Sequence, residues 1–474
     1  MDRDAEQLRR LGYAQQLLRD MGGFANFALS FSIISVLTGA VTLYGHGLRY
    51  GGPFQMLAGW PLVTLFTLTI ACSLAELASR YPTAGALYHW SSILGGRGAG
   101  FFTAWLNTIG QFAITAGIDY GLAEFASAML GMRDRPLGLY CAILFSHAAL
   151  NHLGVRLVGR LNDLSAWVHL AGVAVIVGSL ASFAPHRDAS FLLEKLHDPS
   201  MPYPYAFAVG LLQACWTFTG YDASAHVCEE THDPSRNAPW GIFLSVAVSG
   251  VAGYALVLAV TLAIPDLRAA AAADNPFIYT LNHALGPRLG GALVWTAMAA
   301  MWFCGLASVT SNSRMLFAFA RDGGLPFSRA LASVDGRFKS PAVAVWTSAA
   351  MALLVALWAD AYAAMVALST LALYASYGLP ILCKLRRGRF DAGPWSLGRW
   401  SGTVNGLAVG WIGAATVLFV LPPNQLAGVT FAACLAALTL YWFVWARHRF
   451  RGPPALSVDE ASASTAGSPR RDSR

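Results

Sequence analysis

Long apolar runs alternate with short polar segments along most of this 474-residue chain. A helix needs about 20 apolar residues to cross the hydrocarbon core of a bilayer. By this criterion we predict twelve membrane-spanning helices, at residues 24–46, 53–78, 98–130, 136–155, 161–184, 203–228, 239–265, 289–318, 342–358, 360–383, 402–421 and 427–446. The pattern therefore predicts an all-α polytopic membrane protein, in which the ninth and tenth spans nearly touch.

Polar segments flank this apolar region. Residues 1–22 are charged and amphipathic, and we expect a partly helical lead-in there rather than a cleavable signal peptide. Residues 451–474 are polar and low in complexity, which predicts a disordered tail.

The composition agrees with a membrane protein, because 56% of the residues are hydrophobic and only 12% are charged. Soluble domains carry about twice that charged fraction. All seven cysteines fall in apolar segments, which argues against a disulfide framework and against Cys/His metal spacing.

The placement of Lys and Arg predicts the orientation. With both termini inside, the inside segments carry 24 of these residues and the outside loops carry 7, while Arg314 lies within the eighth span. This excess follows the positive-inside rule, so we expect cytoplasmic termini and a plasma (inner) membrane location. It also explains the net charge of +7 without a nucleic-acid partner.

The first and sixth spans both carry hydroxyl groups and a glycine at mid-depth, which weaken a helix. These residues are Ser32, Ser35, Thr38 and Gly39 in the first span and Thr217, Thr219 and Gly220 in the sixth. The two spans run in opposite directions, and such paired interruptions indicate an inverted-repeat transporter with a site near the midplane. Alternatively, the serines of the first span bond back to their own helix.

Asp222 follows the interruption in the sixth span. An ionisable side chain at membrane depth is costly unless it faces a cavity or a partner, so it is a candidate functional residue. The simpler alternative is a spanning helix with a tolerated glycine kink and an Asp that packs between helices.

Several motifs resemble the amino acid–polyamine–organocation (APC) superfamily, in particular its amino acid, GABA and choline permease branch. They are Leu11-Gly12-Tyr13, residues 75–88 (AELASRYPTAGALY), residues 219–226 (TGYDASAH) followed by Glu229-Glu230-Thr231 and residues 238–242 (APWGI), and residues 313–326 (SRMLFAFARDGGLP). The resemblance covers roughly residues 11–390. It implies a LeuT-like fold, a 5+5 inverted repeat with discontinuous first and sixth helices. We therefore expect a transporter core at 23–390 and two additional helices within 391–450.

The resemblance also implies a substrate site at the two interruptions. Backbone N–H groups of the first would bind a carboxylate, and carbonyl groups of the sixth would bind an ammonium group. The expected site residues are Ser35, Val36, Leu37, Thr38 and Gly39, with Thr217, Phe218, Thr219, Gly220, Tyr221 and Asp222. Phe218 or Tyr221 would act as a lid. Asp222 would pair with a cationic substrate group or hold the broken helix by accepting backbone hydrogen bonds.

The third span adds two pairs of polar residues. Asn107 and Gln111 lie one helical turn apart and either line the site or join helices. Asp119 and Glu124 are expected nearer the outer end of the span, where water can solvate them.

His169 is the candidate coupling residue, because several proton-coupled relatives have a Lys in the corresponding fifth helix. The unperturbed pKa of a histidine lies near 6.5, so His169 is suited to load and release a proton. A histidine bonded between helices is the alternative. Ser308 and Ser311 are the candidate hydroxyl ligands of a sodium ion.

Glu229 and Glu230 end the sixth span on the inside and are predicted to form a gate with Arg80, Arg160 or Arg321. A solvated helix end is the alternative. His226 and Glu230 are spaced i and i+4, but the HExxH order of a zinc enzyme is absent.

We therefore predict a secondary transporter of an amino acid or related small amine, with proton coupling expected and sodium as the other candidate ion. The alternatives are a choline- or polyamine-type organocation transporter, an amino acid exchanger and, less favoured, a channel. No nucleotide-binding loop occurs, and we expect no cofactor, no metal and no enzymatic activity.

Overall fold

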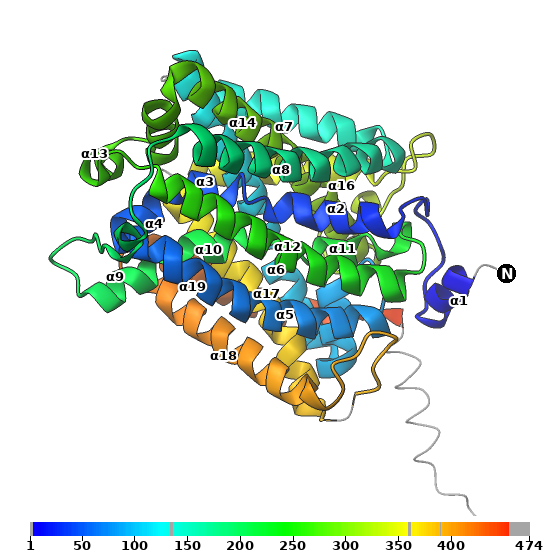
Figure 1. The fold of residues 1–474 in the computed structure, drawn as a ribbon. Coiled ribbons are helices and arrows are strands. Elements are labelled where there is room, and N and C mark those ends of the chain that lie inside the picture. Colours follow the sequence, from blue (N-terminus) through cyan, green and yellow to red (C-terminus); the bar gives the residue numbers. More distant parts are fainter. Residues whose placement is uncertain (1–2, 133–135, 359–361, 389, 455–474) are drawn as a thin grey trace, which may run out of the picture.

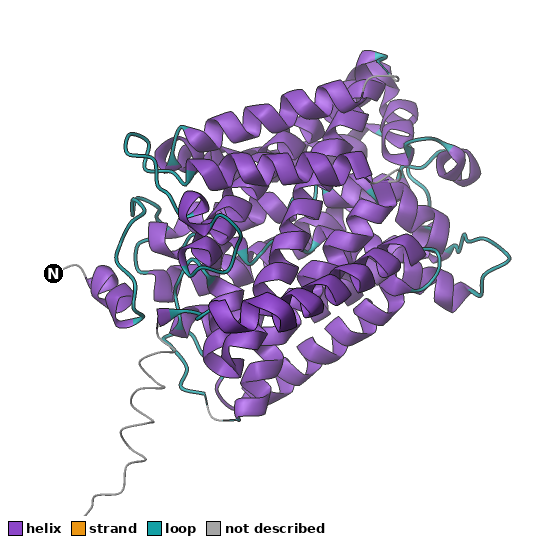
Figure 2. Cartoon of the chain, turned by 180° about the vertical axis from the view of Figure 1, so that it is seen from behind, coloured by secondary structure: helices purple, strands orange, loops and turns teal. Residues whose placement is uncertain are grey.

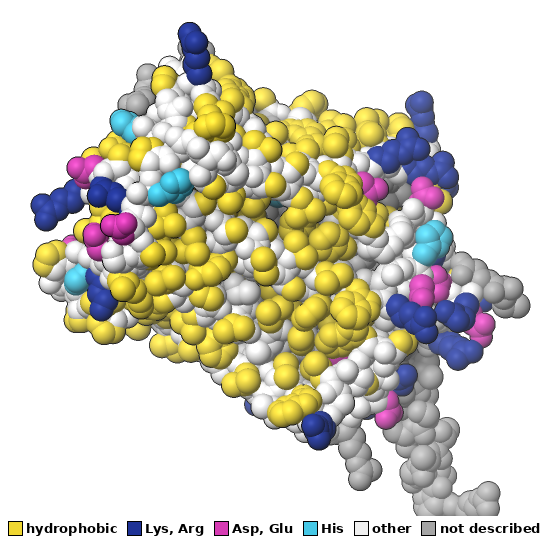
Figure 3. All heavy atoms as spheres, viewed as in Figure 1, with side chains coloured by type: hydrophobic (Ala, Val, Ile, Leu, Met, Phe, Trp, Pro, Cys, Tyr) yellow, Lys and Arg dark blue, Asp and Glu magenta, His cyan; other side chains and the backbone are white. Residues whose placement is uncertain are grey.

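The computed structural model describes residues 3–132, 136–358, 362–388 and 390–454. Within these residues the protein is a bundle of helices without a β-strand (Figure 1), and the view from behind shows the same all-helical arrangement (Figure 2). Charged side chains gather at the two ends of the bundle, and hydrophobic side chains cover the broad band between them (Figure 3). Such a band is the surface that a lipid bilayer requires.

The helices follow the predicted spans. In chain order they are α2 (Gly23–Ile34), α3 (Gly39–Thr42), α4 (Tyr44–Gly51), α5 (Trp60–Arg80), α6 (Ala86–Leu130), α7 (Pro136–His152), α8 (Val155–Phe183), α9 (Tyr203–Gly210), α10 (Leu212–Thr217), α11 (Ala223–His226), α12 (Pro234–Leu262), α14 (Pro276–Arg321), α16 (Ala342–Trp358), α17 (Tyr362–Arg387), α18 (Ser401–Val420) and α19 (Gln425–Tyr441). Eight helical segments of the described chain are long and apolar enough to cross a membrane, and Ala342–Trp358 is a shorter apolar helix.

Two helices begin earlier than their apolar runs. α6 starts at Ala86 and bends at Gly96, whose φ is +85°, and α14 starts at Pro276 and bends at Gly286, whose φ is +78°. Only glycine adopts such a backbone without strain, so each bend joins a short helix to the spanning helix. Counting apolar residues could not detect these extensions, because they are more polar than the spans.

The first and sixth spans are discontinuous, as predicted. α2 and α3 are separated by residues 35–38, and α10 and α11 are separated by residues 218–222. α2 packs between α8 and α12, while α6 packs along α17 and α12 packs along α5 (Figure 1). The interrupted helices therefore lie inside a shell of continuous ones.

The N-terminal segment lies across one end of the bundle, which we call the α1 end after α1 (Arg3–Arg10) (Figure 1). Met21 pairs with Thr231 in an isolated parallel bridge, and Arg19 donates to the carbonyl oxygen of Thr231 over 2.9 Å. These bonds attach the lead-in to the segment that follows α11. The predicted tail beyond residue 454 and the hairpin at 359–361 lie outside the described residues.

Candidate functional site

The interruption of the first span begins at Ser35, where φ is +25° and ψ is +88°. This non-helical residue ends α2 and turns the chain towards Gly39, where α3 starts. The hydroxyl oxygens of Ser35 and Thr38 lie 2.6 Å apart. Both side chains are buried, so the polar groups of the break face the protein interior.

The interruption of the sixth span centres on Gly220, whose φ is +87°. Its backbone N–H donates to the hydroxyl group of Tyr377 on α17 over 3.0 Å. Phe218, immediately before the glycine turn, packs against Trp60 with ring centroids 5.1 Å apart. Continuous helices thus hold the break in place.

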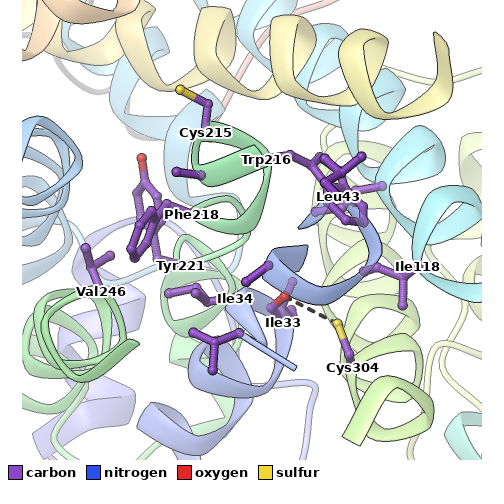
Figure 4. Close-up of a cluster of buried hydrophobic side chains, with 14 of the residues drawn as sticks. Ile33, Ile34, Leu43, Ile118, Cys215, Trp216, Phe218, Tyr221, Val246 and Cys304 are labelled. Atoms are coloured by element: carbon purple, nitrogen blue, oxygen red, sulfur yellow. Dashed lines mark hydrogen bonds between the residues drawn. The ribbon is translucent and has the colours of Figure 1, made fainter. Parts of the chain in front are cut away.

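The two interruptions touch each other. A Cβ atom placed on Gly39 would lie 2.4 Å from Thr217 Oγ1, and one on Gly220 would lie 2.2 Å from Ile33 Cγ2. Beside them is a small cavity of about 10 Å³, lined by Ile33, Ile34, Thr38, Gly39, Ile114, Ile118, Trp216 and Thr217. Figure 4 shows Ile33, Ile34, Ile118 and Trp216 around this region, with the Cys304 thiol donating to the Ile33 carbonyl oxygen over 3.3 Å.

Three predicted residues, Thr38, Gly39 and Thr217, therefore line the cavity. Ser35, Val36, Leu37, Phe218, Thr219, Gly220 and Tyr221 are buried in or beside the two breaks. The prediction missed the apolar lining from α6 and Trp216. A hydrophobic residue in a spanning helix carries no sequence signal that separates a cavity wall from a packed core.

The Asp222 carboxylate is fully buried and bonded by side chains from three directions. Asn107 Nδ2 donates to Oδ2 over 3.0 Å, and Tyr377 donates to Oδ1 over 2.9 Å. His226 Nε2 lies 3.2 Å from Oδ2. Asp222 thus connects α6, α11 and α17 through side chains. The Tyr377 hydroxyl group that donates to Asp222 also accepts from the backbone N–H of Gly220.

The polar residues of α6 reach different partners. Asn107 contacts Asp222, whereas Gln111 donates to Ser311 on α14 over 3.2 Å. Ser308 lies 2.7 Å from the Thr115 hydroxyl group, one turn further along α6. The two candidate serines therefore share a row of hydroxyl and amide groups between α6 and α14.

His169 lies directly against the first interruption. Its Nδ1 is 2.8 Å from the carbonyl oxygen of Ser165, and its Nε2 is 2.7 Å from Ser35 Oγ. The side chain is fully buried. The structure therefore joins the predicted coupling residue to the predicted carboxylate-binding segment.

The expectation for the acidic residues of the third span is wrong for one of them. Asp119 is fully buried, and its Oδ2 lies 3.1 Å from Nδ1 of His147 on α7, whereas Glu124 is exposed. A buried charge needs a partner, and His147 lies too far along the chain for the sequence to identify it.

Two ion pairs with buried carboxylate groups lie at the α1 end. Arg321 donates to both carboxylate oxygens of Glu229 over 2.7 and 2.8 Å, and Arg314 donates to both oxygens of Glu230 over 2.7 and 3.3 Å. We call these four residues the gate pairs, after the gate that the sequence predicts. Bidentate pairs of this kind are the strongest between Arg and carboxylates.

The sequence named Arg321 as a partner of these glutamates but missed Arg314. No bond joins Arg80 or Arg160 to either glutamate among the described contacts, and both arginines are exposed. A signal for Arg314 was present, because an arginine within an apolar span must find a buried partner.

The lead-in segment reinforces the gate pairs. The Arg321 guanidinium lies 4.0 Å from the ring centroid of Tyr13, and the Tyr13 hydroxyl group donates to Asp322 Oδ2 over 2.6 Å. Tyr88 also donates to Oδ2 of Asp322. Burial raises the pKa of the Asp322 carboxyl group to about 7, although the hydrogen bond from Tyr13 opposes this shift.

We expect the wild-type protein to lose thermal stability between about pH 4 and pH 7 partly through Asp322. The unfolded carboxyl group ionises near pH 4, whereas the folded one holds its proton to a higher pH. Raising the pH therefore favours unfolding over this interval. Asp322→Asn should flatten the pH dependence of the unfolding midpoint in detergent. An unchanged slope would contradict the raised pKa.

Among the described residues, no group of three or more His, Cys, Asp or Glu side chains is placed to hold a metal ion. The site instead consists of backbone breaks, hydroxyl groups and paired charges. In secondary transporters, discontinuous helices with such groups form the substrate and ion sites.

Comparisons with known proteins agree with this architecture. A family model described as "Amino acid permease" matches residues 22–445. The chain is 37% identical to the Amino-acid permease BAT1 of Arabidopsis thaliana, over 96% of both chains. It is 36% identical to the BAT1 homolog of Oryza sativa subsp. japonica, over 94% of this chain and 95% of that one. It is 27% identical to the GABA-specific permease of Saccharomyces cerevisiae, over 98% of this chain and 88% of that one.

Proposed function

The chain belongs to the amino acid permease family, and from this premise we propose that it moves an amino acid or related small amine across the membrane by proton-coupled alternating access. The observation that carries the proposal is the close contact between the two interrupted helices, with a small cavity beside it, in a bundle whose α1 end holds two ion pairs. Broken helices at the site and a gate at one end are the parts that alternating access requires.

In this proposal the substrate binds between the two breaks. Residues 35–39 offer backbone N–H groups to its carboxylate, and the carbonyl groups of residues 217–219 accept from its ammonium group. The positions of Thr38, Gly39 and Thr217 on the cavity wall support this assignment. Phe218 or Tyr221 would cover the bound substrate.

We place both termini, and with them the α1 end, in the cytoplasm of a plasma membrane protein. The excess of Lys and Arg in the inside segments supports this orientation. The gate pairs then close the cytoplasmic side. We also propose that residues 23–390 form the transporter core and that the two helices within 391–450 are peripheral additions.

The proton is our proposed coupling ion, with His169 as the residue that the sequence indicates. Its bond to Ser35 supports a link between ion and substrate. If sodium drives transport instead, Ser308 and Ser311 are the expected ligands, and their neighbours Gln111 and Thr115 would contribute further oxygen atoms.

The test is uptake of labelled α-amino acids, GABA, choline and a diamine into proteoliposomes, each with and without an inward proton gradient. We expect saturable uptake of one of the amino acids or GABA that the gradient stimulates. Protein-free liposomes are the control. Uptake that depends on sodium or on internal substrate would replace the proton in this proposal, and no saturable uptake of any compound would reject it.

A further inference from the structure

His226, the last residue of α11, faces a hydrogen-bond acceptor on both sides of its ring. Its Nδ1 lies 3.0 Å from the carbonyl oxygen of Ala84, and its Nε2 lies 3.2 Å from Asp222 Oδ2. Both side chains of the Asp222–His226 pair are fully buried, so water does not replace either contact. A carbonyl oxygen only accepts, and Nδ1 therefore carries a proton.

The other contacts of Asp222 require its oxygens to act as acceptors too. Asn107 donates from Nδ2, and the Tyr377 hydroxyl group, whose oxygen accepts from Gly220 N, donates to Oδ1. A second proton is then needed between Nε2 and Oδ2. The pair thus holds one proton more than an ionised carboxylate beside a neutral imidazole.

His169 differs from His226 in this respect. Its Nδ1 donates to the Ser165 carbonyl oxygen, but its Nε2 meets the Ser35 hydroxyl group. A hydroxyl group can donate as well as accept, so a neutral imidazole satisfies both contacts. The surroundings of His169 do not demand an extra proton, whereas those of His226 do.

Ala84, whose carbonyl oxygen accepts from His226, also bonds to a residue of the gate pairs. The backbone N–H of Ala84 donates to Glu229 Oε1 over 3.2 Å, and Glu229 is held by Arg321. If Glu229 moved away from Ala84 as the gate opened, Ala84 would lose this bond. Movement of this segment would remove the carbonyl group that faces Nδ1 of His226.

We propose that the Asp222–His226 pair is the proton-binding site that couples the substrate site to the gate. It holds its extra proton while the gate pairs are closed and releases it to the α1 side when Ala84 moves away. One proton then crosses with each transport cycle. This inference rests on the proposed proton-coupled function and assigns the coupling proton to this pair in place of His169.

The charged and titratable groups around the pair agree with this role. α17 contributes Tyr377, and the segment at Ala84 connects to Glu229, Arg321 and, through Thr83, to His89. α14 also contributes Arg314, which Glu230 neutralises. α2 presents the neutral Asn26 and Ser30 to Ser224 of α11, and α12 approaches Ser224 through Gly241. Because the charges of the gate pairs neutralise each other, the extra proton is what balances the negative charge of Asp222.

The test compares two transport modes in His226→Gln, whose amide replaces the ring without titrating. Exchange of labelled for internal substrate needs no net proton movement, so we expect it to continue. With an inward gradient of about one pH unit, a carrier of one proton per substrate accumulates up to about tenfold. We expect this accumulation in the wild type and an internal-to-external ratio of about one in His226→Gln, with uptake that no longer varies with pH.

His226→Arg is the second variant, because its permanent charge donates to both acceptors without releasing a proton. We expect it to lose gradient-driven accumulation as well. The control is His283→Gln, at an exposed histidine of α14, which should behave as wild type. If either His226 variant purifies in monodisperse form and accumulates substrate with the wild-type pH profile, the inference is overturned although proton coupling stands. If the wild type itself ignores the gradient, proton coupling fails and the inference fails with it.

Discussion

Replacing Glu230 by alanine is expected to destabilise the protein by about 3–5 kcal/mol, because a buried charge is then left without its partner. Glu230 and Arg314 are each 1% exposed, and two hydrogen bonds join them. The guanidinium of Arg314 cannot lose its charge in a protein. We expect little folded protein after extraction, measured as monodisperse yield and as the thermal midpoint of unfolding in detergent.

The control is Glu6→Ala on the surface helix α1. Glu6 also pairs with an arginine at 2.7 Å, but both side chains are well exposed, so no measurable change in yield is expected. The double variant Glu230→Met/Arg314→Met should recover folded protein, since an apolar pair can replace a buried ion pair at little cost. A stable Glu230→Ala protein would contradict the burial of this gate pair.

Gly39→Ala is expected to reduce uptake to the level of protein-free liposomes. The new methyl group would lie 2.4, 2.7 and 2.8 Å from Oγ1, Cα and Cβ of Thr217. Because one of these atoms belongs to the backbone, the two interrupted helices must move apart. Overpacking of this kind costs typically about 1–3 kcal/mol, and the displacement occurs at the cavity itself. Uptake and thermal unfolding of the purified variant measure the two effects separately.

Gly410→Ala is the matched control for this substitution. Gly410 lies in the membrane helix α18, and nothing lies within 4 Å of a Cβ atom placed there. We expect wild-type uptake and, because alanine favours helices, a small gain in stability. Wild-type uptake by Gly39→Ala would show that the breaks need not approach as closely as they do here.

The interruptions of the first and sixth spans were predictable from the sequence, but the contact between them was not. The hydroxyl groups and glycines of the first and sixth spans predicted both interruptions, because they act on their own helix. The closeness of Gly39 to Thr217 was not predictable, since these residues are far apart in the chain and small residues occur in many spans.

For the charged residues too, the sequence indicated which ones matter but not which residues they pair with. The sequence singled out Glu229, Glu230 and Asp222 as candidate functional residues, because charges are rare at membrane depth. It could not decide that Glu230 pairs with Arg314, that Asp119 meets His147 or that His226 bridges Asp222 and Ala84. Each pairing depends on which faces of distant helices meet.

The sequence by itself therefore determined the all-helical membrane class, the approximate spans and the positions of the breaks, and it predicts an orientation. Hydrophobicity, loop charge and helix weakness act over one helix length or less, and they can be read locally. Only the tertiary structure decided which polar groups meet. In a low-dielectric interior each buried charge must find a partner, and the packing of the helices selects that partner from many candidates.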